Sequence, residues 1–269
     1  MHYVVCIKQV PDVASASHTV RIHPLYGTLI REGVPSVTNR FDLYALEAAL
    51  ELRDAYGGKI TAVTMGPPQA EAVLRDAIAM GVDDAVLLSD PTFAGADTLA
   101  TSFVLARAIE RLEPAAILVF AGLQAIDGDT GQVGPGISRR LGWTQLTYIN
   151  RIGLTRGGTI EVERLLDDGR EVLEARLPAV VTVVKDINEP RLPSLRGLRR
   201  AKTAVIPTWN ADRLGLSEEE VGLAGSPTQV IKVFTPTVSS GGEMTQAPAS
   251  EAAAIFVKWL EDNRILKES

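Results

Sequence analysis

The first half of the chain alternates between short apolar runs and segments whose apolar residues recur at helical spacing. The apolar runs are typical of strands buried on both faces, as in a parallel sheet. Helices are predicted after Asn39, after Pro68 and from Asp97. The predicted strands are Val4–Ile7, Ile60–Val63, Asp84–Leu88 and Ala116–Phe120. This alternation predicts an α/β fold whose mostly parallel sheet is doubly wound, with helices on both faces.

Two β-rich excursions interrupt the alternation. The segment from Thr19 to Pro35 has turn residues between two β-type pieces, which predicts a hairpin. The spacing changes again from about Thr147, where Glu161–Glu163 and Glu171–Leu173 predict a second hairpin around a turn at residues 167–169. A returning strand is predicted at Val180–Val183.

The C-terminal part of the chain has a different composition. After Asn188 it is rich in Pro, Gly and Arg until Gly225, and a final amphipathic helix is predicted from about Ser250 to Asn263. This part has too few apolar residues for a core of its own. We therefore expect an α/β domain over residues 1–187 and an arm over residues 188–269 that packs on another protein.

Composition excludes several classes of function. The net charge of −6 argues against a nucleic-acid partner, and no apolar run is long enough to span a membrane. The N-terminus does not have the pattern of a signal peptide, so we expect a soluble, cytoplasmic protein. One cysteine and three histidines without metal-ligand spacing predict no metal site, and the chain has neither a G-x-S-x-G elbow nor a G-x-x-x-x-G-K-[ST] loop. An organic cofactor would have to supply any redox chemistry.

The segment after the fourth predicted strand is the densest candidate for ligand binding. It runs from Ala121 to Gly134, and Gly122 at the strand end lets a ligand approach the backbone. Asp127 or Asp129 is expected to cap the next helix, with Thr130 at its start, so that free N–H groups there can bind phosphate. The alternative is an ordinary surface turn that binds nothing.

Three weaker candidates share the same predicted sheet edge. Met65 ends the second strand beside Gly66 and offers a soft surface for a purine ring. Asn39–Asp42 groups an amide, a guanidinium, an aromatic ring and a carboxylate at a helix start, although a plain N-cap is the better interpretation of that segment alone. Cys6 ends the first strand, where a buried, unreactive thiol is the default.

Five stretches give the chain a family resemblance. They are VVCIKQVPD, GTLIREGVPS, N-x-x-D-x-x-ALEAAL, TMGPPQAEAVLRDAIAMGVDDAVLLSD and AGLQAIDGDTGQVGP. Together they resemble the beta subunit of an electron transfer flavoprotein over essentially the whole chain. The resemblance implies an adenine-nucleotide-binding sheet and a heterodimer with an alpha subunit that carries an electron-transferring FAD.

The resemblance also implies a set of nucleotide contacts in this chain. They are Cys6, Asn39, Arg40, Phe41, Asp42, Met65, Gly122, Leu123, Gln124, Ala125, Ile126, Asp127, Gly128, Asp129, Thr130, Gly131, Gln132 and Val133. Plain members of the family bind AMP here as a structural ligand, whereas electron-bifurcating and nitrogen-fixation-associated members bind a second FAD. Gly128 and Thr130 resemble the FAD-binding type, which we favour, and Gly131 departs from the alanine common in relatives.

The family also suggests a surface for electron-transfer partners. Asn188–Arg191 and the following Leu192–Arg200 match its partner-recognition loop, with Leu195 as the apolar anchor. Its basic residues are Arg191, Arg196, Arg199 and Arg200. The partner would be a dehydrogenase or quinone oxidoreductase. The chain would be an electron carrier, catalytic only within a bifurcating complex that links NADH or an acyl-CoA-type dehydrogenase to a low- or high-potential acceptor.

Two rival functions remain open from the residues. A stand-alone ATP- or AMP-binding enzyme of the same fold would need a basic triphosphate clamp, and no lysine-containing phosphate loop is present. A small-ligand sensor would dimerise with itself rather than with a second subunit.

Overall fold

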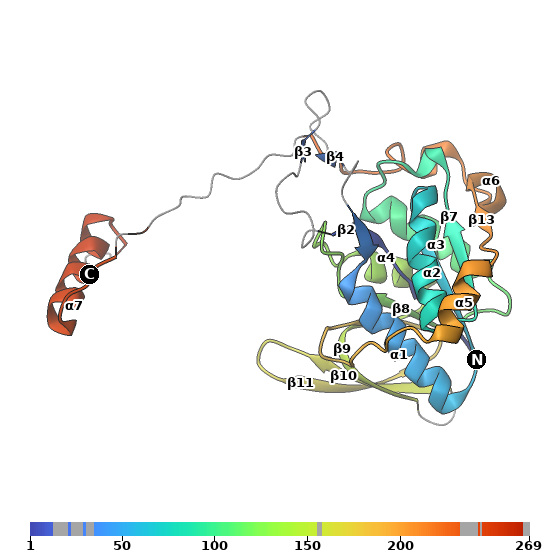
Figure 1. Ribbon diagram of the computed structural model, residues 1–269, viewed down its shortest axis with the longest axis horizontal. Helices are drawn as coiled ribbons and strands as arrows, with labels where there is room; N and C mark the ends of the chain where they lie inside the picture. The colour runs from blue at the N-terminus through green and yellow to red at the C-terminus, as the bar shows by residue number, and fades with distance from the viewer. Residues whose placement is uncertain are drawn as a thin grey trace. The chain divides into compact units, whose positions relative to one another are not determined.

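A computed structural model describes residues 1–12, 21–22, 29–30, 35–154, 158–231, 242 and 244–265 (Figure 1). The chain divides into two compact units, Met1–Lys232 and Val233–Ser269. No helix among the described residues is long and apolar enough to cross a membrane.

One large sheet organises the first unit. Among the described residues, nine strands form it in the order β11-β10-β9-β12-β8-β1-β6-β7-β13. Their bounds are β1 His2–Cys6, β6 Lys59–Met65, β7 Asp84–Leu88, β8 Leu118–Gly122, β9 Thr144–Leu154, β10 Thr159–Leu165, β11 Arg170–Arg176, β12 Ala179–Val183 and β13 Thr208–Trp209. Along the sheet, every pair of neighbouring strands from β9 and β12 to β7 and β13 is parallel. The β9–β10 and β10–β11 pairs, at the other edge, are antiparallel. The predicted doubly wound α/β fold is confirmed.

Helices cover both faces of this sheet. Those of the first unit are α1 Arg40–Tyr56, α2 Glu71–Met80, α3 Thr98–Glu110, α4 Val133–Leu141, α5 Leu195–Thr203 and α6 Ala211–Leu214, with 3₁₀ turns η1 Pro68–Ala70, η2 Pro91–Phe93 and η3 Glu218–Glu220. Leu46, Leu50 and Leu74 bury the α1 and α2 side, where α5 also packs. Val104, Ile137 and Leu214 bury the side of α3, α4 and α6.

Local sequence signals account for several element ends. Asp97 accepts hydrogen bonds from the N–H groups of Leu99 and Ala100 and so caps α3, the helix that was predicted to start there. The β10–β11 hairpin around residues 167–169 is also confirmed. Two small antiparallel pairs join β2 Gln9–Pro11 to β5 Ser36–Thr38 and β3 Arg21–Ile22 to β4 Leu29–Ile30. The latter agrees with the predicted N-terminal hairpin, whose turn residues Pro24 and Gly27 lie outside the described residues.

Strand β9 was not predicted. Its register against β12 shifts between Val181 and Val183, and Tyr148 has a positive φ of 60°. Such an irregularity breaks the two-residue alternation on which strand prediction rests. The strand is therefore identified by its pairing with β10 and β12 and not by its sequence pattern.

The segment after Asn188 contains a helix, α5, that was not predicted. Ser194 caps α5 by accepting a hydrogen bond from the N–H of Gly197, and the chain then returns to the sheet as β13 beside β7. Helix α5 was missed because it is short and strongly charged, with Ala201 its one buried residue. Ser194, a residue type that favours the N-cap position, was the one local signal for the start of this helix.

The second unit contains one described helix, α7 Ala249–Asp262, which confirms the predicted C-terminal helix. None of its residues is buried. The rings of Phe256 and Trp259 stack with centroids 6.4 Å apart.

Candidate functional site

The carboxyl ends of β8, β1 and β6 meet at one edge of the sheet. These strands are neighbours, and Cys6 pairs with Val63 on one side and Ala121 on the other. The helix reached after β1, α1, covers one face, whereas the helix after β8, α4, covers the opposite face. Parallel sheets bind ligands at such a change of direction. The predicted candidate segments after β1, β6 and β8 are therefore brought together.

Asn39 does not cap α1 with its side chain, although it precedes the helix. Its Nδ2 donates a hydrogen bond of 2.9 Å to the carbonyl of Gln124, and its Oδ1 accepts one of 3.2 Å from the N–H of Ile126. The interpretation of Asn39 as a plain N-cap is thus wrong. The amide instead holds the segment between β8 and α4, here called the β8–α4 loop (residues 123–132).

Asp42 is buried behind the same loop. One carboxylate oxygen accepts the N–H of Lys8 at 2.8 Å and the other accepts the N–H of Gly122 at 3.2 Å. Burial raises the pKa of Asp42 to about 7, although the hydrogen bonds from Asn39, Lys8 and Gly122 oppose that shift. Asp42 therefore joins the ends of β1 and β8.

The expected capping of α4 is wrong. The helix begins at Val133 after Gln132, and no side chain caps it. Asp127 forms an ion pair with Lys8 at 2.6 Å, and Asp129 accepts a hydrogen bond of 2.9 Å from the Gln124 side chain. Thr130 lies in the exposed loop before the helix and not at its first turn. The N-terminal N–H groups of α4 thus have no side-chain cap, which suits an anionic ligand.

The two central glycines have different roles. A Cβ atom on Gly122 would lie 2.5 Å from Asp42 and 2.6 Å from Phe41, so this glycine lets the start of α1 approach β8. The expectation that Gly122 leaves space for a ligand is wrong for this reason. A Cβ atom on Gly128 would have no neighbour within 4 Å. Gly128 is the glycine that faces open space.

The other predicted contact residues fall into two groups. Cys6 is buried in the core, and burial raises the pKa of its thiol to about 12, which confirms the unreactive interpretation. Met65 is half-buried against the same core. Arg40 is exposed at the start of α1, and its neighbour Phe41 is half-buried. Met65, Arg40 and Phe41 can therefore face a ligand at this edge, whereas the Cys6 thiol faces the core.

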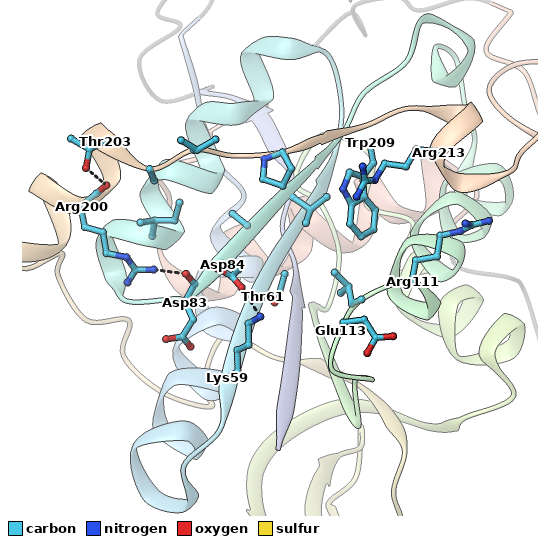
Figure 2. Close-up of a pocket in the computed structure, with 17 residues that line it drawn as sticks. Lys59, Thr61, Asp83, Asp84, Arg111, Glu113, Arg200, Thr203, Trp209 and Arg213 are labelled. Carbon is cyan, nitrogen blue, oxygen red and sulfur yellow. Dashed lines mark hydrogen bonds and ion pairs between the residues drawn. The ribbon is translucent and has the colours of Figure 1, made fainter.

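A cavity of about 420 Å³ adjoins the candidate site. Its walls are mostly apolar and include Phe41, Leu123, Tyr148, Leu165 and Val184. A larger cavity of about 650 Å³ lies at the opposite edge, where β6 and β7 begin (Figure 2). The cations there already have protein partners: Lys59 pairs with Asp84, and Arg111 donates to the carbonyl of Leu214. The smaller cavity is the one relevant to the candidate site.

The residues expected to recognise an electron-transfer partner do not all face outward. Leu195 is 80% exposed, and Arg196 and Arg199 are exposed beside it on α5. Arg191 instead binds Glu47 and Asp54 of α1, and Arg200 donates to the carbonyls of Val82 and Asp83. The expected basic collar is therefore reduced to Arg196 and Arg199.

Two polar residues of the site were missed from the sequence. Lys8 follows β1 directly, and Thr98 at the start of α3 donates a hydrogen bond of 2.7 Å to Gln132. The position of Lys8 just beyond a predicted buried strand was a usable signal. No local signal linked Thr98 to Gln132, because 34 residues separate them.

The fold and this edge define an α/β protein with a sheet of the adenine-nucleotide-binding type. Residues 26–214 match the electron transfer flavoprotein domain family. The chain is 46% identical over 266 residues to the electron transfer flavoprotein subunit beta of Clostridium acetobutylicum, across 99% of this chain and 100% of that relative.

Two further relatives carry other names. Protein FixA of Azorhizobium caulinodans is 47% identical, across 94% of this chain and 90% of its own length. The caffeyl-CoA reductase-Etf complex subunit CarD of Acetobacterium woodii is 46% identical, across 99% of this chain and all of its own length. The chain belongs to the electron transfer flavoprotein family and groups with its beta subunits. Beta subunits of this family pair with an alpha subunit, and the assembly transports electrons.

Proposed function

We propose that this chain binds FAD at the carboxyl edge of its sheet and acts in an electron-bifurcating heterodimer with an alpha subunit. The observation that carries the proposal is the similarity, over almost the full length, to both FixA and CarD. The plain alternative is a beta subunit that holds AMP as a structural ligand in the same place.

The geometry of the edge fits a phosphate-bearing nucleotide. The N-terminus of α4 has no side-chain cap, and the space beside Gly128 is open. Gly128–Val133 would hold the phosphates, while Met65, Arg40 and Phe41 lie where the adenosine would bind. A bound FAD would supply the electron-transfer chemistry that protein side chains lack.

The neighbouring cavity favours FAD over AMP. Its apolar walls begin at Phe41 and Leu123, which are both candidate contact residues, and its volume of about 420 Å³ falls in the range of small-molecule sites. AMP has no second ring system to occupy such a cavity. FAD has one.

The same relatives support a proposal for the electron partners. CarD is a subunit of a complex with caffeyl-CoA reductase, which supports a partner of the acyl-CoA dehydrogenase type for this chain. Within such a complex the chain would pass electrons between NADH or that dehydrogenase and a low- or high-potential acceptor. The partner surface would be the exposed part of α5, with Leu195 as its apolar anchor.

Counting cofactors tests the proposal directly. The complex of this chain with its alpha subunit is purified, denatured and assayed for released FAD and AMP. We expect two FAD per heterodimer. One FAD and one AMP would refute FAD binding by this chain and leave the plain electron-transfer function intact.

Replacing Gly128 with Asp tests the location of the nucleotide. The new carboxylate would oppose the pyrophosphate, with a repulsion on the order of 4 kcal/mol per charge pair at an effective dielectric constant near 20. FAD affinity should fall about a hundredfold or more, so the variant complex should lose one of its two FAD molecules. Gly169→Asp is the matched control, because both added side chains enter open space. Full FAD content in Gly128→Asp would rule out phosphate binding at this loop.

A further inference from the structure

The last part of the first unit passes the start of α3 before the chain enters the second unit. We infer that Asp97 and Thr228 form a clasp that fixes the point at which the chain leaves the first unit and so positions the second unit for assembly with the alpha subunit. Both are positioning residues, and neither needs to contact the alpha subunit. The inference does not depend on the nucleotide that the chain binds, so a failure of the FAD proposal would leave it standing.

The two oxygens of the Asp97 carboxylate bind different segments. Oδ1 accepts the N–H groups of Leu99 at 2.9 Å and Ala100 at 3.0 Å, which caps α3. Oδ2 accepts the N–H of Thr228 at 3.1 Å and its hydroxyl at 2.8 Å. Desolvation raises the pKa of Asp97, but hydrogen bonds from Ala100 and Thr228 outweigh it and hold the pKa below its ordinary value. The carboxylate is therefore ionised at neutral pH and accepts all four bonds.

Ser226 attaches the same segment at a second point. Its hydroxyl oxygen accepts the N–H of Asp97 at 2.8 Å, and its hydroxyl donates to the carbonyl of Gly222 at 2.6 Å. Ser226 is 8% exposed, so water has little access to these bonds. A Cβ atom on Gly222 would lie 1.9 Å from the carbonyl oxygen of Thr92. Gly222 therefore lets the segment pack directly on the turn that precedes α3.

Beyond the clasp the chain exposes apolar side chains. Val230 is 72% and Ile231 is 92% exposed. In the second unit, Phe256 and Trp259 stack on α7, and none of the helix residues is buried. Apolar groups left uncovered in this way mark surfaces that associate with another protein. Since beta subunits of this family pair with an alpha subunit, the alpha subunit is the partner that fits.

A fixed exit point acts on assembly through the population of binding-competent molecules. The second unit is tethered to the first, so its effective concentration at the alpha subunit depends on where the tether starts and how long it is. When the clasp opens, the free tether lengthens and its starting point varies. Only a fraction of the molecules can then bind one alpha subunit with both units, and the affinity falls by that fraction. The loss of one hydrogen bond of ordinary strength corresponds to a change of about fivefold.

Two variants open the clasp from opposite sides. Thr228→Val removes the hydroxyl bond to Asp97 and keeps the shape of the side chain. Asp97→Asn keeps one oxygen to cap α3 and replaces the oxygen that accepts from Thr228 with an amide nitrogen, which donates. Thr92→Val is the matched control, because the Thr92 hydroxyl also donates at 2.8 Å to a capping carboxylate, that of Asp90, but within a single 3₁₀ turn.

The dissociation rate of the alpha subunit measures the effect on assembly. It is obtained from the exchange of labelled alpha subunit out of the purified heterodimer into an excess of unlabelled heterodimer. We expect Thr228→Val and Asp97→Asn to accelerate dissociation about fivefold, whereas Thr92→Val leaves the rate unchanged. An unchanged rate in either clasp variant, or an equal acceleration in Thr92→Val, would overturn the inference.

Hydrogen exchange of the heterodimer tests whether the clasp forms. The Thr228 amide should be protected in the wild type, because it donates to Asp97, and it should exchange faster in Asp97→Asn. Thr92→Val should keep the protection. A Thr228 amide that is unprotected in the wild type would show that the clasp is open and would equally overturn the inference.

Discussion

Asp42 is buried between the ends of two strands, and this burial disfavours the ionised form of its carboxyl group. Its pKa rises from 3.8 to about 7 in the folded protein. Between these values the folded state binds a proton that the unfolded state has released. The free energy of unfolding should therefore fall as pH rises from about 4 to about 7, and this contribution should level off above the folded pKa.

The variant Asp42→Asn isolates this contribution. The thermal midpoint of the complex is measured from pH 4.5 to pH 8 for the wild type and the variant. The variant should lose the part of the pH dependence that Asp42 causes, because its amide does not titrate. The Cys6 thiol also interacts electrostatically with this carboxylate, but burial raises its pKa to about 12, outside that window. Identical pH profiles would contradict a raised pKa at Asp42.

Arg191 stabilises the fold through ion pairs with α1, and this role differs from the expected recognition of a partner protein. Its guanidinium lies 2.8 Å from Glu47 and 2.9 Å from Asp54, and Glu47 is 4% exposed. Removing the arginine would leave the Glu47 charge buried without its partner. Such a change typically costs about 3–5 kcal/mol of stability.

Arg191→Ala should therefore destabilise the complex by about 3 kcal/mol or more, as measured by urea unfolding. The control is Arg151→Ala, which breaks pairs with Glu161 and Glu163 made by a 62% exposed arginine. That loss should be about 1 kcal/mol or less. Equal effects of the two variants would show that the Arg191 network adds no more stability than an exposed ion pair.

At the scale of elements, α5 carries two sets of side chains: one set attaches the helix to the rest of the first unit, and the other is exposed. Arg200 and Ala201 face the body of the protein, whereas Leu195 and Arg196 face outward. A short helix can hold an apolar side chain in a fixed direction at little cost in conformational entropy on binding. This arrangement suits recognition by a partner protein.

Leu195→Ala should slow electron transfer to the partner dehydrogenase about tenfold, through loss of an apolar anchor, while flavin content and thermal midpoint stay normal. Stopped-flow reduction of the complex measures the rate. Val205→Ala is the matched control, because Val205 is 94% exposed and lies outside the helix. Unchanged transfer kinetics in Leu195→Ala would remove α5 as the recognition element.

At the scale of the whole molecule, apolar surface remains uncovered in each unit. Val230 is 72% and Ile231 is 92% exposed in the first unit, and Phe256 and Trp259 are exposed on α7 in the second. Exposed apolar groups of this kind mark surfaces that associate with other proteins. The alpha subunit is the expected partner.

We accordingly predict that this chain is unstable or aggregates when produced without the alpha subunit. Light scattering and far-UV circular dichroism at micromolar concentration measure this for the isolated chain and for the heterodimer. The heterodimer should be monodisperse and the isolated chain should not. A folded, monodisperse monomer would contradict the prediction.

Features that depend on neighbouring residues were determined by the sequence alone. The alternation of strands and helices, the Asp97 cap and the β10–β11 turn follow from periodicity and turn chemistry over a few residues. Parallel pairing then placed Cys6, Met65 and Gly122 at one edge. The position of the candidate site was therefore predictable, whereas β9 and α5 were missed because their local patterns are broken or strongly charged.

Only the tertiary structure decided what the polar side chains do. Asn39 bonds a residue 85 positions away, Asp42 one 80 positions away, and Arg191 one 144 positions away. No periodicity specifies such partners, because they depend on how the strands are ordered in the sheet. The Asn39 amide and the Asp42 carboxylate could form hydrogen bonds with a ligand as readily as with backbone groups. Their burial determines which of these partners they bind.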